Sequence, residues 1–247
     1  MRVAVLNDIH GNLPALDAVL AEVAEAGVDA IVVGGDLAWG PLPRETLERL
    51  IALDGRASFV MGNADRDVVK AFDGGAPEHE AVSAYCAARI SQTHRDFLAS
   101  LSPPVVLDVD GLGATVFCHG SPRSDTERIT TATPDARLRR ILEGVGESTV
   151  VCGHTHRQFD RRIDGRRVVN AGAVGLPYQG RAGAFWALLG PDVELRCTDY
   201  DIDDALRAFR AGGMTGDVER ELRLSLFEPA DPDEVAAHFE AQAESGA

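Results

Sequence analysis

The chain has 247 residues, 45% hydrophobic and 26% charged, a balance typical of one large globular domain rather than a disordered or fibrous protein. Its net charge of −15 argues against bulk nucleic-acid binding and against an anionic membrane surface, because phosphate contacts need clustered lysine and arginine. No stretch approaches the roughly 20 apolar residues of a membrane helix, and the first apolar run is short, so we expect a cytoplasmic protein without a signal peptide.

The four cysteines lack the CxxC spacing of zinc and redox sites, which favours free thiols in a reducing compartment. Three of them, Cys118, Cys152 and Cys197, lie inside expected strands, where a thiol behaves as a small hydrophobe. Cys118 precedes His119 directly, so a sulfur ligand is the alternative. Side chains alternate along a strand, however, and Cys118 should therefore point away from His119 into the core.

Strands and helices alternate from the start of the chain. Residues 3–6 form an apolar run typical of a strand, residues 13–26 carry apolar side chains at helical spacing up to Gly27, and residues 30–33 predict a second strand. Asn12 is placed to cap the first helix, and the alternative is that it directs its side chain to the strand edge. We then expect a helix over residues 43–53, a strand over 57–61 and a helical insert over about 65–103.

The second half of the chain is richer in strands. Strands are expected over 105–109, 114–118 and 149–152, with a helix over 134–142. Residues 159–163 and 167–170 flank Asp164-Gly165, and residues 184–189 and 193–198 flank Gly190-Pro191, so we expect two antiparallel pairs and interpret this half as a β-meander. The interpretation for residues 1–200 is an α/β fold, a four-layer αββα sandwich of two mixed sheets.

An acidic, helical extension is expected over residues 201–247, with breaks at glycine and proline and with Asp231 as the cap of the last helix. Two roles remain open for this extension. It could make the contact of a homo-oligomer, or it could cover the fold of its own chain.

Five short polar clusters follow the ends of apolar, β-branched runs. They are Asp8-Ile9-His10-Gly11-Asn12, Gly34-Gly35-Asp36, Gly62-Asn63, His119-Gly120 and Gly153-His154-Thr155-His156. Open α/β sheets bind ligands beyond the carboxyl ends of their strands, so we expect these side chains to gather at one edge. Mixed carboxylate and imidazole ligands suit Mn²⁺, Fe²⁺, Ni²⁺ or Zn²⁺ better than Mg²⁺ or Ca²⁺, and we favour Mn²⁺.

The spacing within these clusters suits two metal ions. Asp8 and His10 lie one residue apart at a strand end and are expected to point to the same side, and the GHTH cluster repeats this spacing. Asp36, isolated after two glycines, is the candidate bridge, because a carboxylate can span two metals. The glycines before Asp36, Asn63 and His154 are expected to allow close backbone approach and positive φ.

In this order the clusters resemble the calcineurin-like metallophosphoesterase superfamily, whose pattern is DxH, GD, GNH(D/E), H and GHxH. The resemblance spans about residues 1–200 and is greatest for the small bacterial phosphodiesterase branch, where segments similar to 119–122 and 170–177 recur. The resemblance implies one metal bound by Asp8, His10, Asp36 and His156, and a second bound by Asp36, Asn63, His119 and His154. It also implies the layered sandwich.

The implied activity is hydrolysis of a small phosphoester, with phosphodiesters favoured. Two ions about 3.5 to 4 Å apart can activate a shared water for direct attack on phosphorus. Asp8, Asp36, Asn63 and His119 would then act in catalysis through the metals. The alternatives are a phosphomonoesterase for nucleotides or phosphoproteins on the same site, and a non-catalytic scaffold, which the complete ligand set disfavours.

One position departs from the family pattern, because GNH(D/E) reads Gly62-Asn63-Ala64-Asp65 here. An alanine can neither donate a proton nor bind a phosphoryl oxygen. The leaving oxygen must then depart as an anion or take its proton from water, so the rate should depend steeply on the pKa of the leaving group.

Arginines near the clusters are candidates for phosphate contacts, namely Arg66, Arg123 and Arg181. For each of them the alternative of a solvated surface side chain is the more common case. Asp125 and Glu127 follow Arg123 in an expected loop and are expected to pair with it, the alternative being that they tune access to the site. The histidines outside the clusters, which are His79, His94 and His238, are expected to be exposed.

Overall fold

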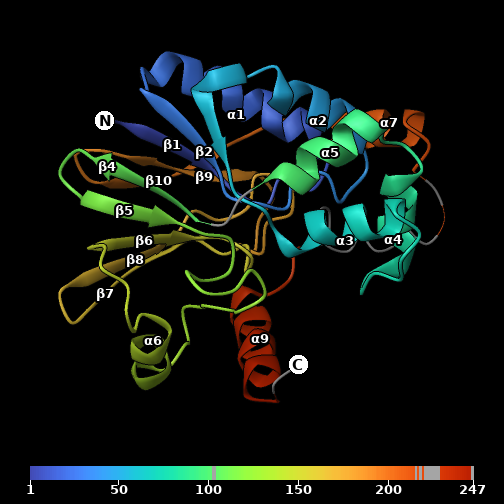
Figure 1. Ribbon diagram of the computed structural model, residues 1–247. Helices are drawn as coiled ribbons and strands as arrows, with labels where there is room; N and C mark the ends of the chain where they lie inside the picture. The colour runs from blue at the N-terminus through green and yellow to red at the C-terminus, as the bar shows by residue number, and fades with distance from the viewer. Residues whose placement is uncertain (102–103, 215, 217–218, 220–228, 246–247) are drawn as a thin grey trace.

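A computed structural model describes the chain from residue 1 to residue 245, apart from residues 102–103, 215, 217–218 and 220–228. Two five-stranded sheets lie face to face in this structure (Figure 1). Helices cover the outer face of each sheet. The predicted αββα sandwich of two mixed sheets is therefore confirmed.

The first sheet has the strand order β10 (Val193–Thr198), β9 (Ala184–Leu189), β1 (Val3–Leu6), β2 (Ala30–Val33) and β3 (Ala57–Phe59). β1, β2 and β3 run parallel, and β9 pairs antiparallel with both β1 and β10. β1 is fully buried because its alternate side chains enter two different cores. Val3 and Val5 face the second sheet, whereas Ala4 and Leu6 face the helices.

The second sheet has the strand order β4 (Val105–Val109), β5 (Gly113–Phe117), β6 (Thr149–Cys152), β8 (Arg166–Asn170) and β7 (Phe159–Ile163). β5, β6 and β8 are parallel, and the two edge strands β4 and β7 are antiparallel to their neighbours. Phe117, Val151 and Val169 meet Val5 and Val32 of the first sheet in the central core.

The predicted β-meander is wrong, although both of its hairpins form. A meander needs consecutive strands in one sheet, but β8 belongs to the second sheet and β9 to the first. The reason is burial, because all six side chains of β9 are buried. A strand of that kind needs cover on both faces, and β9 has it because Ala184, Trp186 and Leu188 enter the core under the helices while Ala187 and Leu189 enter the core between the two sheets.

The outer layers are helical. α1 (Leu13–Ala26) and α2 (Pro43–Ile51) cover the first sheet, and α6 (Asp135–Ile141) covers the second through Leu138 and Ile141. A single 3₁₀ turn, Asp54–Arg56, leads from α2 into β3. Asn12 caps α1 by accepting a hydrogen bond from the Ala15 N–H, and its amide donates to the Gly175 carbonyl and to Tyr200, so its side chain is structural.

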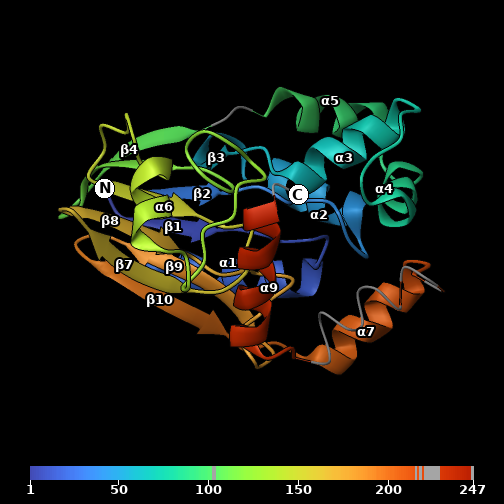
Figure 2. The ribbon, with the colours of Figure 1, turned by 90° about the horizontal axis from the view of Figure 1, so that it is seen from below.

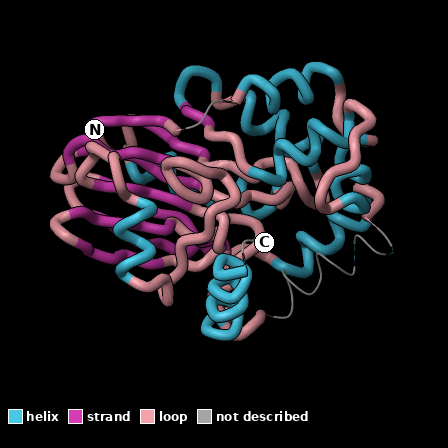
Figure 3. Tube along the Cα trace, turned by 60° about the horizontal axis from the view of Figure 1, so that its bottom comes forward, coloured by secondary structure: helices cyan, strands magenta, loops and turns pink. Residues whose placement is uncertain are grey.

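Three further helices stand at one end of the sandwich, which are α3 (Asn63–Phe72), α4 (Glu80–Ala87) and α5 (Gln92–Ser100). Figure 3 shows the strands gathered on one side of the molecule and most helices on the other. His94 lies in α5 and is buried, which contradicts the expected exposure, because its ring and Ser91 cap the helix start. His79 and His238 are exposed as expected.

The C-terminal segment contributes α7 (Ile202–Ala211) and α9 (Pro232–Ser245). Ala205 and Phe209 of α7 enter the core of the first sheet. α9 stands beside the loops that leave the strands (Figure 2), and Asp231 caps its start by accepting the Glu234 N–H. No helix among the described residues is long and apolar enough to cross a membrane.

The thiols follow the sequence prediction. Cys86, Cys118 and Cys152 are buried, Cys197 is half-buried, and all four are free. Cys118 packs in the core between the second sheet and α6 together with Cys152 and Leu138. Its sulfur lies 3.5 Å from the Val151 carbonyl oxygen and, among the described residues, belongs to no group of possible metal ligands.

Candidate metal centre

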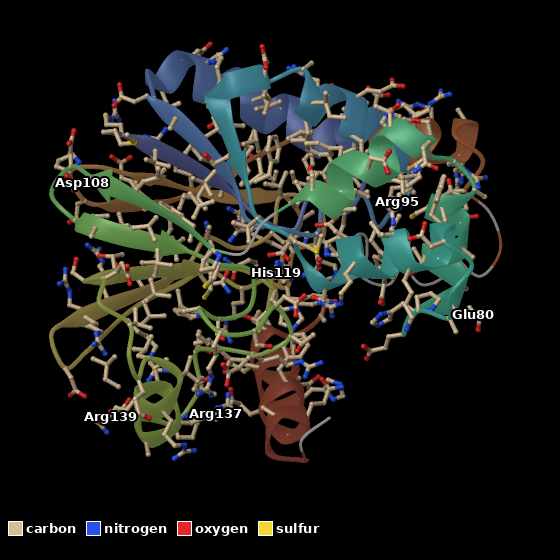
Figure 4. All side chains as sticks on the ribbon, in the orientation of Figure 1. Glu80, Arg95, Asp108, His119, Arg137 and Arg139 are labelled. Atoms are coloured by element: carbon tan, nitrogen blue, oxygen red, sulfur yellow. The ribbon has the colours of Figure 1, made fainter. Side chains whose placement is uncertain are left out.

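All five polar clusters meet at the carboxyl ends of strands from both sheets. The first sheet supplies Asp8 and His10 after β1, Asp36 after β2 and Asn63 after β3, and the second supplies His119 after β5 and His154 and His156 after β6. Figure 4 places His119 near the middle of the molecule, where the loops of the two sheets converge. Backbone hydrogen bonds join the loops, for example from Gly153 N to the His119 carbonyl at 2.8 Å.

One group of possible ligands comprises Asp8, His10, Asp36 and His156, whose ligand atoms all lie within 4.8 Å of one another. All four residues are buried. The Nε2 atoms of His10 and His156 are 3.2 Å apart, and His156 Nε2 lies 3.3 Å from Asp8 Oδ1. Two imidazole nitrogens and two carboxylates that face one point match the mixed ligand set predicted for the first metal.

A second group comprises Asp36, His119 and His154, again within 4.8 Å. His119 Nε2 lies 3.4 Å from Asp36 Oδ2 and 3.0 Å from Asn63 Oδ1, which adds the amide oxygen to this group. His154 Nε2 is buried without a hydrogen-bond partner. A buried polar atom without a partner costs free energy, and a cation in this group would remove that cost.

Hydrogen bonds at the Nδ1 atoms orient three of the imidazoles. The Nδ1 atoms of His10, His119 and His156 lie 3.0, 2.9 and 2.7 Å from the backbone carbonyls of Trp39, Gly34 and Leu176, in that order. A carbonyl can only accept, so each Nδ1 carries the proton and donates it. In the neutral form of each ring the Nε2 lone pair is then directed into the site, which is the arrangement of metal-binding histidines.

The charge state of the site follows from burial and from its carboxylates. Burial lowers the pKa of His10 to about 4 and that of His154 to about 3, so both imidazoles are neutral and able to bind a cation. Burial would also lower the pKa of His119, but the Asp36 and Asp8 carboxylates outweigh it and raise that pKa to about 10. The metal-free protein therefore holds a proton where the ligand set would hold a cation.

The backbone at the ligands departs from the sequence prediction. Asp8, His10, Asp36, His154 and His156 themselves adopt left-handed conformations, with φ between 49° and 64°. Such conformations cost on the order of 1 kcal/mol each and persist where the surrounding structure imposes them, commonly at functional sites. Asp8 and His10 do face the same site, but through this loop geometry rather than through the alternation of an extended strand.

The glycine prediction holds in part. Gly35 has a φ of 97°, but Gly62 and Gly153 do not adopt positive φ. They are needed for close approach instead, since a Cβ atom would lie 2.1 Å from Asp36 Oδ1 at residue 62 and 2.5 Å from Asp8 Oδ2 at residue 153. The absence of a side chain at these two positions lets the ligand carboxylates lie against the backbone.

Asp65 was not among the predicted metal ligands or substrate-binding residues, yet it organises the site. Its buried carboxylate accepts hydrogen bonds from the backbone N–H groups of Leu37, Ala38 and Gly62 at 2.8, 3.3 and 3.2 Å. Those bonds join the loop that carries Asp36 to the start of α3. Burial and the nearby Asp36 carboxylate raise the pKa of Asp65 to about 7, although the three N–H donors favour its charged form. The sequence feature that could have indicated this role is its place in the first turn of a helix that begins at Asn63, where an acidic side chain can accept hydrogen bonds from backbone N–H groups.

Tyr178 is a second such residue. Its ring stacks on the His156 imidazole, with centroids 4.8 Å apart and an interplanar angle of 19°, and its N–H donates to the His156 carbonyl. The Phe239 ring of α9 contacts the Tyr178 ring in a tilted arrangement, with centroids 6.1 Å apart. The C-terminal helix is thereby in contact with the support of a candidate ligand.

The three candidate phosphate-binding arginines are all engaged in ion pairs. Arg66 pairs with Asp125, Arg123 pairs with Glu127 at 2.5 Å, and Arg181 lies 3.7 Å from Asp199. The expected pairing of Arg123 is therefore correct for Glu127, whereas Asp125 takes Arg66 as its partner. Arg66 stands one turn from Asn63 on α3, and Arg123 borders a cavity beside His119.

Buried carboxylates, an amide and imidazoles at the meeting edge of two layered sheets define the class of metal-dependent phosphoesterases. Comparison with known sequences agrees, because residues 1–189 match the calcineurin-like phosphoesterase superfamily domain. The chain belongs to this superfamily, which generally binds two divalent metals.

Individual relatives share most of the chain. A metallophosphoesterase from Sphaerobacter thermophilus is 27% identical, with a TM-score of 0.73 over 92% of this chain and 99% of that one. A hypothetical protein from Pyrococcus horikoshii OT3 has the same fold, with 23% identity and a TM-score of 0.77 over 90% and 97% of the two chains. An uncharacterised protein of Methanocaldococcus jannaschii is 27% identical over 230 residues, which are 82% of this chain and 89% of that protein.

Proposed function

We propose that the protein is a dinuclear metal-dependent phosphodiesterase. The observation that carries this proposal is the position of Asp36, which belongs to both groups of possible ligands. A carboxylate shared by two adjacent groups is the feature that a two-metal site requires and a single-metal site does not.

The residues fit two first-row divalent cations, with Mn²⁺ favoured over Fe²⁺, Ni²⁺ and Zn²⁺. Asp8, His10, Asp36 and His156 would hold one cation, and Asp36, Asn63, His119 and His154 the other. When bound, such a pair polarises phosphoryl oxygens and lowers the pKa of water. The carbonyls behind the imidazoles keep each ring in the tautomer that presents Nε2 to the site.

Two features favour a small diester substrate over a monoester. Asp8, Asp36 and Asp65 place three buried carboxyl groups at or next to the site, and a monoester dianion brings one more negative charge toward them than a diester does. Ala64 offers no proton to the leaving oxygen, since its side chain is a buried methyl group and its N–H is donated to Asp36. Leaving groups that need no protonation are therefore favoured.

The test combines metal reconstitution with a substrate series. The purified protein is stripped with a chelator, single metals are added back, and hydrolysis of aryl diesters and of alkyl and aryl monoesters is measured. We expect restored activity, highest with aryl diesters. A preference for alkyl monoesters would move the assignment to a phosphomonoesterase, and metal binding without turnover of any ester would favour a scaffold.

Asp36→Asn tests the shared ligand directly. Elemental analysis should find two metals per chain in the wild type, and Asp36→Asn should weaken the binding of both. Asp164→Asn is the matched control, because Asp164 also has positive φ but lies in the exposed β7–β8 turn. Two metals retained in Asp36→Asn would contradict the bridging role.

A further inference from the structure

A cavity of about 350 Å³ opens beside the second group of ligands. It lies between the segment that follows β3 and the loop that follows β5, and the His119 residue itself forms part of its wall. Most of the remaining wall is apolar, formed by Val60, Met61, Pro104, Cys118 and Pro122. A volume of this size lies in the range of small-molecule pockets.

We propose that this cavity is the ester-group pocket, which receives an uncharged, ring-sized alcohol portion of the phosphodiester. The proposal rests on the proposed function, because it assumes that phosphorus binds at the metal groups. A phosphoryl group held there has His119 and Asn63 beside it. Met61 lies two residues before Asn63 and lines the cavity together with His119, so the cavity adjoins the place where an ester substituent would emerge.

The charges around the cavity favour an uncharged substituent. Arg123 and Asp125 are the charged residues in its wall, and each is already paired, with Glu127 and Arg66 respectively. A second phosphate or carboxylate on the substrate would have to break one of these pairs to gain a counter-charge. An aromatic or aliphatic ring needs no such exchange, and it gains by leaving water for the apolar wall.

The test uses phosphonate monoesters, because the phosphoryl group of each carries one negative charge and a single ester group. Methyl, phenyl and 4-carboxyphenyl methylphosphonate are titrated into the Mn²⁺-loaded protein by isothermal titration calorimetry. We expect the phenyl ester to bind at least about tenfold more tightly than the methyl ester. The 4-carboxyphenyl ester should lose most of this advantage.

Met61→Trp should fill the cavity and bring the ratio of phenyl to methyl affinity close to one. Met61→Ala, which enlarges the cavity without adding bulk, provides a second variant and should lower the ratio by about threefold. Leu195→Trp is the control, because Leu195 is a partly exposed residue of β10 outside the cavity, and it should keep the wild-type ratio. Thermal melts establish that each variant is folded.

The outcomes separate the pocket from the proposed function. Metal-dependent binding of both esters with equal affinity in the wild type would overturn the ester-group pocket and leave the phosphodiesterase proposal intact. An unchanged ratio in folded Met61→Trp would also overturn the pocket. Failure of every ester to bind, together with absence of hydrolysis in the substrate series, would overturn both.

Discussion

The carboxylate of Asp65 offers a sharp test of how the site is built. Three backbone N–H groups from two segments of the chain, at Leu37, Ala38 and Gly62, donate to this one fully buried side chain. The change Asp65→Ala removes the acceptor and leaves those donors buried without partners. We therefore expect the variant to be less stable and the loop that carries Asp36 to be less rigidly positioned.

The size of the effect can be worked out from these contacts. Hydrogen bonds contribute about 1 kcal/mol each, and more when the acceptor is charged, while unsatisfied buried donors add a penalty. Three such bonds predict a loss of about 3 to 5 kcal/mol, which is a large part of the roughly 5 to 15 kcal/mol that stabilises a typical domain. Equilibrium urea unfolding of the metal-free protein would measure this loss.

Asp67→Ala is the matched control. Asp67 lies in the same helix and is also buried, but its ion pair is with the exposed His79, at 3.5 Å. This variant should lose less than about 1 kcal/mol. Metal affinity should fall in Asp65→Ala and not in Asp67→Ala. Equal losses of stability in the two variants, or full metal affinity in Asp65→Ala, would refute the reasoning.

Three further outcomes are expected. Burial opposes a proton on His119, but the Asp36 and Asp8 carboxylates raise its pKa to about 10, so metal binding must release that proton. Metal affinity measured by calorimetry should therefore rise about tenfold per pH unit between roughly pH 7 and 9. A metal affinity that does not change with pH would contradict this. Tyr178→Ala should weaken metal binding by about threefold to tenfold, because the ring stacked on His156 is lost. Tyr178→Phe keeps the ring, so its metal affinity should stay within about twofold of the wild-type value. Equal metal affinities of the two variants would argue against support by the ring. Rates across substituted aryl diesters should fall steeply as the pKa of the leaving phenol rises, since residue 64 is an alanine, and a flat series would point to another proton donor.

Local patterns in the sequence determined most of the elements and the positions of the site residues. The burial of β1 and β2 and the apolar face of α1 are visible as runs and spacings of residues, because periods of 2 and 3.6 are properties of the local backbone. Each polar cluster directly follows such a run. Since parallel strands end at a common edge, the meeting of Asp8 and Asp36 could be predicted before any coordinates were available, whereas His154 joins them only because the second sheet packs on the first.

The tertiary structure decided what depends on contacts between distant segments. β9 joins β1 in the first sheet, where its buried side chains enter the core under the helices and the core between the sheets, and no local pattern specifies that partner. The left-handed backbone at His10 and His156 arises because neighbouring loops impose it against the intrinsic preference of these residues.

The same reason applies to the contacts that support the site. The tautomers of the imidazoles depend on carbonyls that are remote in sequence, such as Gly34 behind His119. From the sequence, both Asp125 and Glu127 were expected to pair with Arg123. In the structure Asp125 pairs instead with Arg66, 59 residues away. Residue spacing encodes what a segment can form by itself, whereas the choice among distant partners is made by packing and charge once the two sheets have come together.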